Sequence, residues 1–142
     1  MTDIEKAKQT LLSGGYTCVL CRDDDMHTST LRGVKPLVQL VESGNDFSLF
    51  SAADKVIGKA TAFLYVILGV KSVYASVISV PALEVLQKHK IEISYGKLTE
   101  NIINRRGDGI CPFEEAVLKF DAPEDAYRAI CDKLLFVSKF IN

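Results

Sequence analysis

The sequence predicts an α/β protein with a three-layer α/β/α sandwich and a mixed sheet, folded as a single domain over residues 1–142. Stretches with the apolar spacing of helices alternate along the chain with runs that are rich in β-branched residues. An early pair of strands joined by an acidic turn is typical of an antiparallel hairpin, so the sheet is expected to be mixed rather than purely parallel. The length of 142 residues and the hydrophobic fraction of 48% suit one well-formed core.

The N-terminal part predicts a helix, a hairpin and a second helix, in that order. The first helix spans residues 3–13, because Thr2 is a good N-cap and the glycines that follow residue 13 favour a helix end. The hairpin pairs residues 16–25 with residues 26–33. The second helix covers residues 34–44 and carries a proline in its first turn, where the missing N–H costs little.

The middle of the chain contains its most apolar segment. Residues 46–50 are expected to form a short strand or extended piece that leads into this segment, and residues 51–69 are expected to form one long helix. Ser51 is a good N-cap for that helix, and Asp54 would stand at its third position, as in a capping box. Because apolar residues occur on nearly every face, we expect this helix to be buried on most sides.

The C-terminal half predicts two further strands and three helices. Residues 71–79 are rich in β-branched side chains and indicate a central strand. The remaining elements are expected to be a helix over 81–90, a strand over 91–98, a loop over 99–110, a short helix over 111–120 and a final helix over 122–140.

Composition excludes several classes of protein. The 17 basic and 18 acidic residues leave a formal charge of −1, so charge does not support nucleic-acid binding. Four cysteines are too few for a disulfide scaffold. The first ten residues carry no apolar signal core, and the apolar stretch over residues 60–70 is too short for a bilayer, so we expect a cytoplasmic protein that does not enter the membrane.

The first candidate site is the start of the predicted 51–69 helix. Lys55 and Lys59 would lie one helical turn apart there, where two cations oppose the helix dipole. Asp54 offsets part of this cost, and an anionic ligand at the helix N-terminus would offset the rest. Gly58 would let such a ligand approach closely. The alternative is that both lysines simply extend into solvent.

The second candidate site follows the last predicted strand. Arg105 and Arg106 lie in a glycine-rich turn, which is suited to carboxylate or phosphate. Cys111 stands at a helix start, a position that lowers the pKa of a thiol, and Glu114 is a proton carrier or a cap. The alternative is a solvated loop with a buried cysteine and a capping glutamate.

Other polar residues favour structural interpretations. Ser79 precedes Pro81 at the start of a predicted helix and either caps it or contacts a ligand, of which we favour the cap. Cys18 and Cys21 match a CxxC pattern, but in a strand they point to opposite faces and are expected to pack in the core. We assign the same packing role to Cys131, and structural or surface roles to the two histidines, His27 and His89.

The combination of DKVIGKA, then VYASVIS and PALEVLQKH, then IINRRGDGICPFE resembles a family of small uncharacterised prokaryotic domains in the cytidine deaminase-like superfamily. The resemblance covers the chain from about Gly15 to Arg128. It implies a three-layer fold whose sheet opens with an antiparallel hairpin, and an active site where two helices start. In deaminases the first of these helices carries His-x-Glu and the second carries Pro-Cys-x-x-Cys, which together bind one zinc ion.

The zinc ligands that this resemblance implies are missing. Asp54 would stand in the first motif, and in the second only Pro81 matches, because Ala82 and Val85 replace the two cysteines. A water-activating zinc needs three protein ligands, so we expect no metal and no cofactor. One replacement ligand set stays open: Asp54, Cys111 and Glu114.

The sequence therefore favours a domain that binds an anionic small molecule, such as a nucleotide or nucleoside derivative. The alternatives are a nucleoside or nucleic-acid deaminase with an atypical metal set, and a protein-interaction domain; a homo-oligomer is expected by analogy with the superfamily. The candidate ligand-binding residues are Gly58, Lys59, Ser79, Pro81, Arg105 and Arg106. The candidate catalytic residues, if there is a reaction, are Asp54, Lys55, Cys111 and Glu114.

Overall fold

The computed structural model describes residues 1–103, 107 and 109–140, with backbone only at residues 137–140. Its elements, in chain order, are α1 (Asp3–Gly14), β1 (Cys18–Arg22), β2 (Asp25–Ser29), α2 (Lys35–Ser43), β3 (Ser51–Ile57), α3 (Lys59–Leu68), β4 (Ser72–Ser79), α4 (Val80–Lys88), β5 (Glu92–Thr99), α5 (Pro112–Val117) and α6 (Pro123–Phe140). The predicted α/β class is confirmed.

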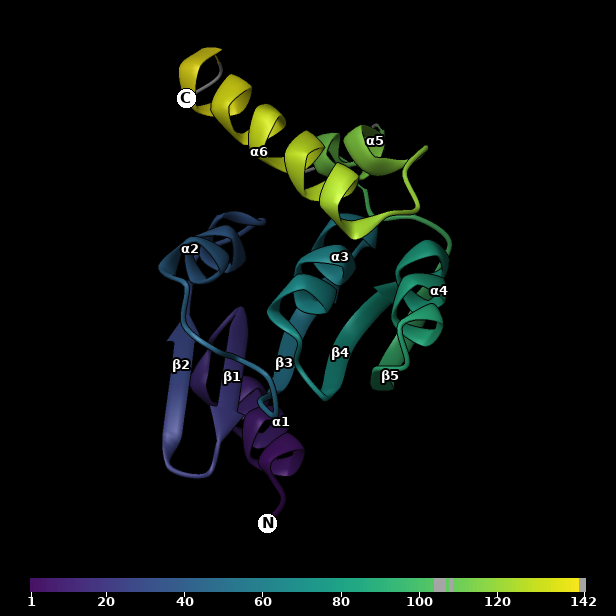
Figure 1. The fold of residues 1–142 in the computed structure, drawn as a ribbon. Helices are drawn as coiled ribbons and strands as arrows, with labels where there is room; N and C mark the ends of the chain where they lie inside the picture. Colours follow the sequence, from purple (N-terminus) through teal and green to yellow (C-terminus); the bar gives the residue numbers. More distant parts are fainter. Residues whose placement is uncertain (104–106, 108, 141–142) are drawn as a thin grey trace.

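The described strands form one mixed sheet in the order β2-β1-β3-β4-β5. The β1 strand runs antiparallel to both β2 and β3, whereas β3, β4 and β5 are parallel to one another. Helix α1 covers one face of the sheet, and the other helices lie on the opposite side (Figure 1). The predicted hairpin and three layers are thus present.

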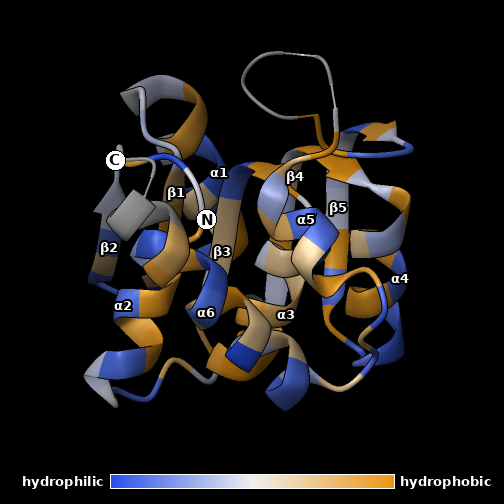
Figure 2. Cartoon of the chain, turned by 90° about the horizontal axis from the view of Figure 1, so that it is seen from above, coloured by the Kyte–Doolittle hydropathy of each residue, from blue (hydrophilic) through white to orange (hydrophobic). Residues whose placement is uncertain are grey.

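Helix α3 is the centre of the helical side. It contacts α2, α4, α5 and α6, and its Phe63, Leu64 and Tyr65 are almost fully buried. Seen from above, hydrophobic residues concentrate on the strands and on α3, while hydrophilic residues are more frequent on the outer helices (Figure 2). A helix packed on so many sides needs apolar residues all round, which explains the composition of the 59–68 segment.

The prediction of one helix over 51–69 is wrong. Residues 51–57 form the strand β3 in the middle of the sheet, Gly58 has an extended backbone, and the helix begins only at Lys59. A central strand is buried on both faces and therefore lacks an alternating pattern, so a short apolar run of this kind does not distinguish a strand from a buried helix. Of the short strand or extended piece predicted over 46–50, no strand forms, because residues 48 and 49 are in a turn and Leu49 has a φ of 70°.

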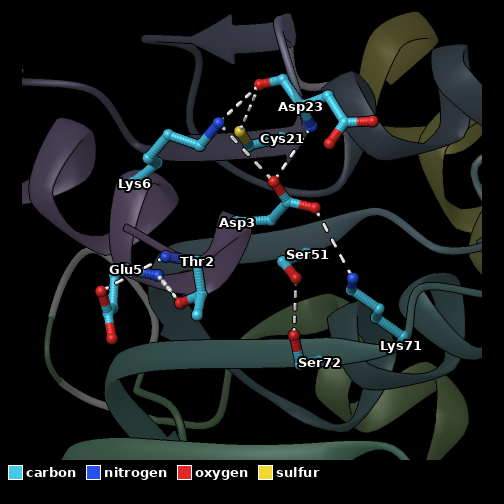
Figure 3. Close-up of polar contacts among 9 residues, drawn as sticks. All are labelled: Thr2, Asp3, Glu5, Lys6, Cys21, Asp23, Ser51, Lys71 and Ser72. Carbon is cyan, nitrogen blue, oxygen red and sulfur yellow. Dashed lines mark hydrogen bonds and ion pairs between the residues drawn. The ribbon is translucent and has the colours of Figure 1, made fainter.

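Helix α1 is held against its face of the sheet by a polar network around Asp3 (Figure 3). One carboxylate oxygen of Asp3 accepts a hydrogen bond from the backbone N–H of Asp23 at 3.0 Å and lies 3.7 Å from the Lys6 ammonium. The other oxygen lies 3.5 Å from the ammonium of Lys71, just before β4. The N-terminus of α1 also has the predicted Thr2 cap, in a complete capping box with Glu5.

The described helices include none with the length and hydropathy of a membrane span.

Candidate functional site

The N-terminus of α3 already holds an anion, and that anion belongs to the protein. The carboxylate of Glu114, on α5, accepts hydrogen bonds from the backbone N–H groups of Lys59 at 2.7 Å and Ala60 at 2.9 Å. Glu114 is only 6% exposed. Burial raises its pKa, and the two backbone donors together with the Lys59 charge act in the opposite direction.

Gly58 makes this contact sterically feasible. A Cβ built on Gly58 would lie 2.6 Å from Oε2 of Glu114 and would also collide with the other atoms of the carboxyl group. The predicted close approach at Gly58 therefore exists, but the approaching group is Glu114 rather than a ligand.

Lys55 and Lys59 do not form the predicted pair on one helical face. Lys55 lies on β3 with an exposed side chain, whereas Lys59 is the first residue of α3. The Lys59 ammonium donates a hydrogen bond to the carbonyl oxygen of Leu118 at 2.9 Å. The helical argument for an anionic ligand at this point is therefore wrong, because one of the two cations is on a strand.

Asp54 is likewise part of β3 and caps no helix. Its Oδ2 accepts a hydrogen bond from the Tyr65 hydroxyl at 2.6 Å, and its Oδ1 accepts one from the Val56 backbone N–H at 3.3 Å. Desolvation raises the pKa of Asp54 to about 7, while the hydrogen bond from Tyr65 acts in the opposite direction. This carboxyl group therefore titrates near neutral pH inside the helical side of the fold.

The start of α4 is capped as predicted. The Ser79 hydroxyl is fully buried and accepts a hydrogen bond from the Ala82 backbone N–H at 3.2 Å. Pro81 lies in the first turn of the helix, where a missing N–H is tolerated. Ser79 thus has a structural role that needs no ligand.

The remaining members of the predicted site are dispersed. Cys111 is half-buried at the start of α5, without a side-chain hydrogen bond to the helix. Arg105 and Arg106 lie outside the described residues. Over the described ranges 1–103, 107 and 109–140, no three or more His, Cys, Asp or Glu residues gather as a metal site would require. The replacement zinc set of Asp54, Cys111 and Glu114 is therefore not brought together, and these residues do not fit a zinc ion.

The CxxC cysteines pack as expected. Cys18 and Cys21 belong to the two separate cores on opposite faces of the sheet. Burial raises the pKa of Cys18 to about 12, so this thiol stays protonated at neutral pH. Their spacing has neither a redox nor a metal-binding geometry.

The structure places a hollow of about 750 Å³ elsewhere, between α3, the end of α4 and the start of α6. Val66 and Ile67 of α3 form its apolar wall, and α6 contributes Tyr127, Arg128 and Cys131. Burial, followed by contact with Cys131, raises the pKa of Tyr127 to about 12. The phenol is thus a neutral hydrogen-bonding group at physiological pH.

A second hollow of about 120 Å³ lies along the same helix. Lys59 and Phe63 of α3, Pro81 and Lys88 of α4, and the residue Asp121 border it. Lys59 and Pro81 are thus the two predicted ligand-binding residues that the structure places at a hollow. The two hollows together are called the α3 groove below.

His89 lies at the junction of the two hollows and lines both of them. Its Nε2 is buried and has no hydrogen-bond partner among the described residues. Sequence reasoning assigned His89 a structural or surface role, because a histidine at a helix C-terminus is common. Only the docking of α6 against α3 shows that its ring lies in a groove, and no local signal in the chain could have shown this.

Residues 6–134 match the family model described as "TM1506: Domain of unknown function (DUF1893)". The chain belongs to this family. The DUF1893 chain is also similar to a solved structure, the DUF1893 family protein TM1506 from Thermotoga maritima, with a TM-score of 0.82 and 26% sequence identity over 88% of this chain and 85% of that one. No curated protein matches the chain.

The match confirms the resemblance to an uncharacterised domain family, and the cytidine deaminase-like superfamily stays a prediction. The DUF1893 description assigns no activity, so the functional argument rests on the groove and the residues that line it.

Proposed function

We propose that this DUF1893 domain binds a small anionic molecule, such as a nucleotide or nucleoside derivative, in the α3 groove. The observation that carries the proposal is the buried Nε2 of His89, which has no partner in the described part of the chain. A buried polar atom left without a hydrogen bond costs about 1–3 kcal/mol. A ligand with a suitably placed donor or acceptor would recover this cost.

The shape and chemistry of the groove support a ligand of small-molecule size. The larger hollow, at about 750 Å³, lies within the range of about 300–1,000 Å³ that is typical of small-molecule sites. It combines an apolar wall from Val66 and Ile67 with a few convergent polar groups, which include Tyr127 and Arg128. Apolar surface with a small number of polar groups is the usual composition of such sites.

The N-terminus of α3 is a poorer candidate for the anion. Glu114 already satisfies the backbone N–H groups of Lys59 and Ala60, so an external anion would have to displace a buried carboxylate. The α3 groove is therefore the better candidate for the ligand site than the β3–α3 junction. The deaminase alternative finds no support, because the residues expected to replace the zinc ligands do not gather at one point among the described residues. One of them, Asp54, is already hydrogen-bonded to Tyr65.

Binding is tested by thermal unfolding of the full chain with AMP, UMP, adenosine, uridine and inorganic phosphate. A ligand present at 100 times its Kd stabilises the folded state by about 2.7 kcal/mol, which is readily measured as a rise in Tm. We expect at least one nucleotide or nucleoside to raise Tm. We also expect His89→Gln and Arg128→Ala to reduce that rise.

Arg32→Ala is the matched control for Arg128→Ala, because Arg32 is exposed between β2 and α2 and lines neither hollow. A full panel without any rise in Tm would contradict the proposal. So would a rise that neither His89→Gln nor Arg128→Ala changes. If the groove variants alter the oligomeric state in size-exclusion chromatography and leave Tm shifts untouched, the protein-interaction alternative is supported instead.

A further inference from the structure

The charges around the α3 groove restrict the kind of ligand that it takes. Among the described residues, three cations line the two hollows, Lys59, Lys88 and Arg128, against four carboxylates, Glu84, Asp121, Glu124 and Asp132. The negative side chains outnumber the positive ones. A groove with this balance does not attract a polyanion, because each additional negative charge on the ligand is repelled at least as strongly as it is attracted.

The larger hollow is suited to a neutral, apolar body. Val66 and Ile67 form one wall, and the Tyr127 ring forms part of another. Arg128, the one cation that the described part of the chain contributes to it, is outnumbered by Glu124 and Asp132. An aromatic or aliphatic body would bury these apolar walls, whereas an anionic group placed there would face net repulsion.

The smaller hollow is suited to one anionic group. Lys59 and Lys88 lie at its border together with Glu84 and Asp121, so its lining charges balance, whereas those of the larger hollow are net negative. Its volume of about 120 Å³ accommodates a group of the size of a carboxylate or phosphate. The Lys59 ammonium is already bonded to the Leu118 carbonyl oxygen. The Lys88 ammonium makes no ion pair within residues 1–103, 107 and 109–136, so it is the cation that remains for a ligand.

The position of His89 connects the two hollows. Its ring lines both, and its buried Nε2 lacks a partner among the residues described. An imidazole nitrogen either donates or accepts a hydrogen bond, so it matches a polar atom at the link between the two parts of a ligand.

We propose, on the basis of the small-molecule binding argued above, that the ligand is a bipartite molecule with a single anionic group. Its apolar body lies in the larger hollow, its single carboxylate or phosphate group lies by Lys88 in the smaller hollow, and its linking polar atom contacts His89. Inorganic phosphate lacks the body, a neutral aromatic lacks the charge, and a triphosphate carries too much charge for the lining.

The test uses four probes on the full chain: 1-naphthyl phosphate, 1-naphthol, inorganic phosphate and tripolyphosphate. Calorimetric titration is expected to give the tightest binding for 1-naphthyl phosphate, with each of the other three at least about tenfold weaker. Lys88→Ala is expected to weaken 1-naphthyl phosphate about tenfold and to leave 1-naphthol unchanged, because only the former carries the anionic group.

Lys35→Ala is the control, since Lys35 is an exposed lysine on α2 that lines neither hollow. Lys88 is also exposed, so its variant is expected to keep the fold, and a thermal melt without probe verifies this. Equal affinities for 1-naphthyl phosphate and inorganic phosphate would overturn the bipartite ligand, as would a Lys88→Ala effect no larger than that of Lys35→Ala. If either of these results is found but nucleotides still bind in a way that depends on His89, the bipartite ligand is excluded and the proposed function is retained. No binding of any nucleotide, nucleoside or naphthyl probe would overturn both.

Discussion

Gly58 and Glu114 occupy complementary space at the junction of the sheet and the helical layer. The carboxylate of Glu114 lies where a side chain at position 58 would have to be, and from there it accepts hydrogen bonds from the first two backbone N–H groups of α3. A glycine at the end of a strand and a glutamate on a distant short helix therefore together complete the start of the most buried helix.

Replacing Glu114 with alanine is expected to destabilise the fold by about 2 kcal/mol, because two N–H groups at a buried helix start lose their acceptor. Urea denaturation measures the change. Glu115→Ala is the matched control: both residues lie in the first turn of α5, but Glu115 is exposed. Equal destabilisation by the two variants would show that the contact with α3 contributes nothing.

Gly58→Ala is expected to destabilise the fold by about 1–3 kcal/mol, because the added methyl group collides with the Glu114 carboxyl group. The collision disappears when Glu114 is itself alanine. The double variant should therefore be more stable than the sum of the two single effects predicts, and a double-mutant cycle in urea measures this coupling. Strict additivity would be the contrary result.

Asp54 is expected to make stability depend on pH. Its pKa rises from 3.8 in the unfolded chain to about 7 in the folded one, so the folded state binds the proton more tightly. The resulting stabilisation is complete below pH 3.8 and is lost as the pH rises through about 7. The free energy of unfolding is measured in urea at pH 5 and pH 8 for the wild type and for Asp54→Asn. Between these pH values the wild type should lose about 2 kcal/mol more stability than the variant.

Tyr65→Phe provides an independent check on Asp54. The Tyr65 hydroxyl donates to the Asp54 carboxylate and thereby lowers its pKa. Removing this donor is expected to raise the pKa further and to extend the pH-dependent loss of stability to higher pH. If Asp54→Asn and the wild type have parallel stability profiles between pH 5 and 8, the carboxyl group is not titrating in this range.

Asp3→Asn is expected to destabilise the fold by about 1 kcal/mol, because Asp3 accepts a hydrogen bond from the Asp23 backbone N–H and pairs with the ammonium groups of Lys6 and Lys71. Added salt should reduce the difference, since these contacts are near the surface. Asp24→Asn, at an exposed turn position, is the control. A destabilisation that is the same at low and high salt would exclude the ion pairs as its source.

Lys90→Gly is expected to stabilise the fold by about 0.5–1 kcal/mol. Lys90 has a φ of 60° just after α4, in the left-handed region that costs a non-glycine residue about 1 kcal/mol. Lys88→Gly, inside the last turn of the helix, should have the opposite sign, because glycine has a low helix propensity. Thermal unfolding compares the two, and destabilisation by Lys90→Gly would contradict the expected relief of strain.

Much of the fold was predictable because local signals act within a few residues. Thr2 caps α1, Ser79 caps α4, and the β-branched run of β4 forms a strand as expected. The exception is β3, which was predicted as the first half of a helix. A strand buried on both faces carries no alternating pattern, so its conformation depends on pairing with β1 and β4.

The candidate site was harder to predict than the fold. The argument from Lys55 and Lys59 failed with the helix on which it depended, and the backbone N–H groups at the start of α3 bind the Glu114 carboxylate instead of a ligand. The α3 groove was not predicted, because His89 and Tyr127 belong to helices that are distant in the chain and come close only when α6 docks on α3.

The α/β class, the hairpin, most helix limits and the packing of the CxxC cysteines could be inferred from the amino-acid order alone, since they depend on periodicity, caps and turn residues that act locally. Three features became visible only in the folded chain: residues 51–57 are a strand, Glu114 binds the start of α3, and His89 faces a groove. The physical reason is that burial and hydrogen-bond satisfaction depend on partners far away in the chain, and local patterns carry no information about those partners.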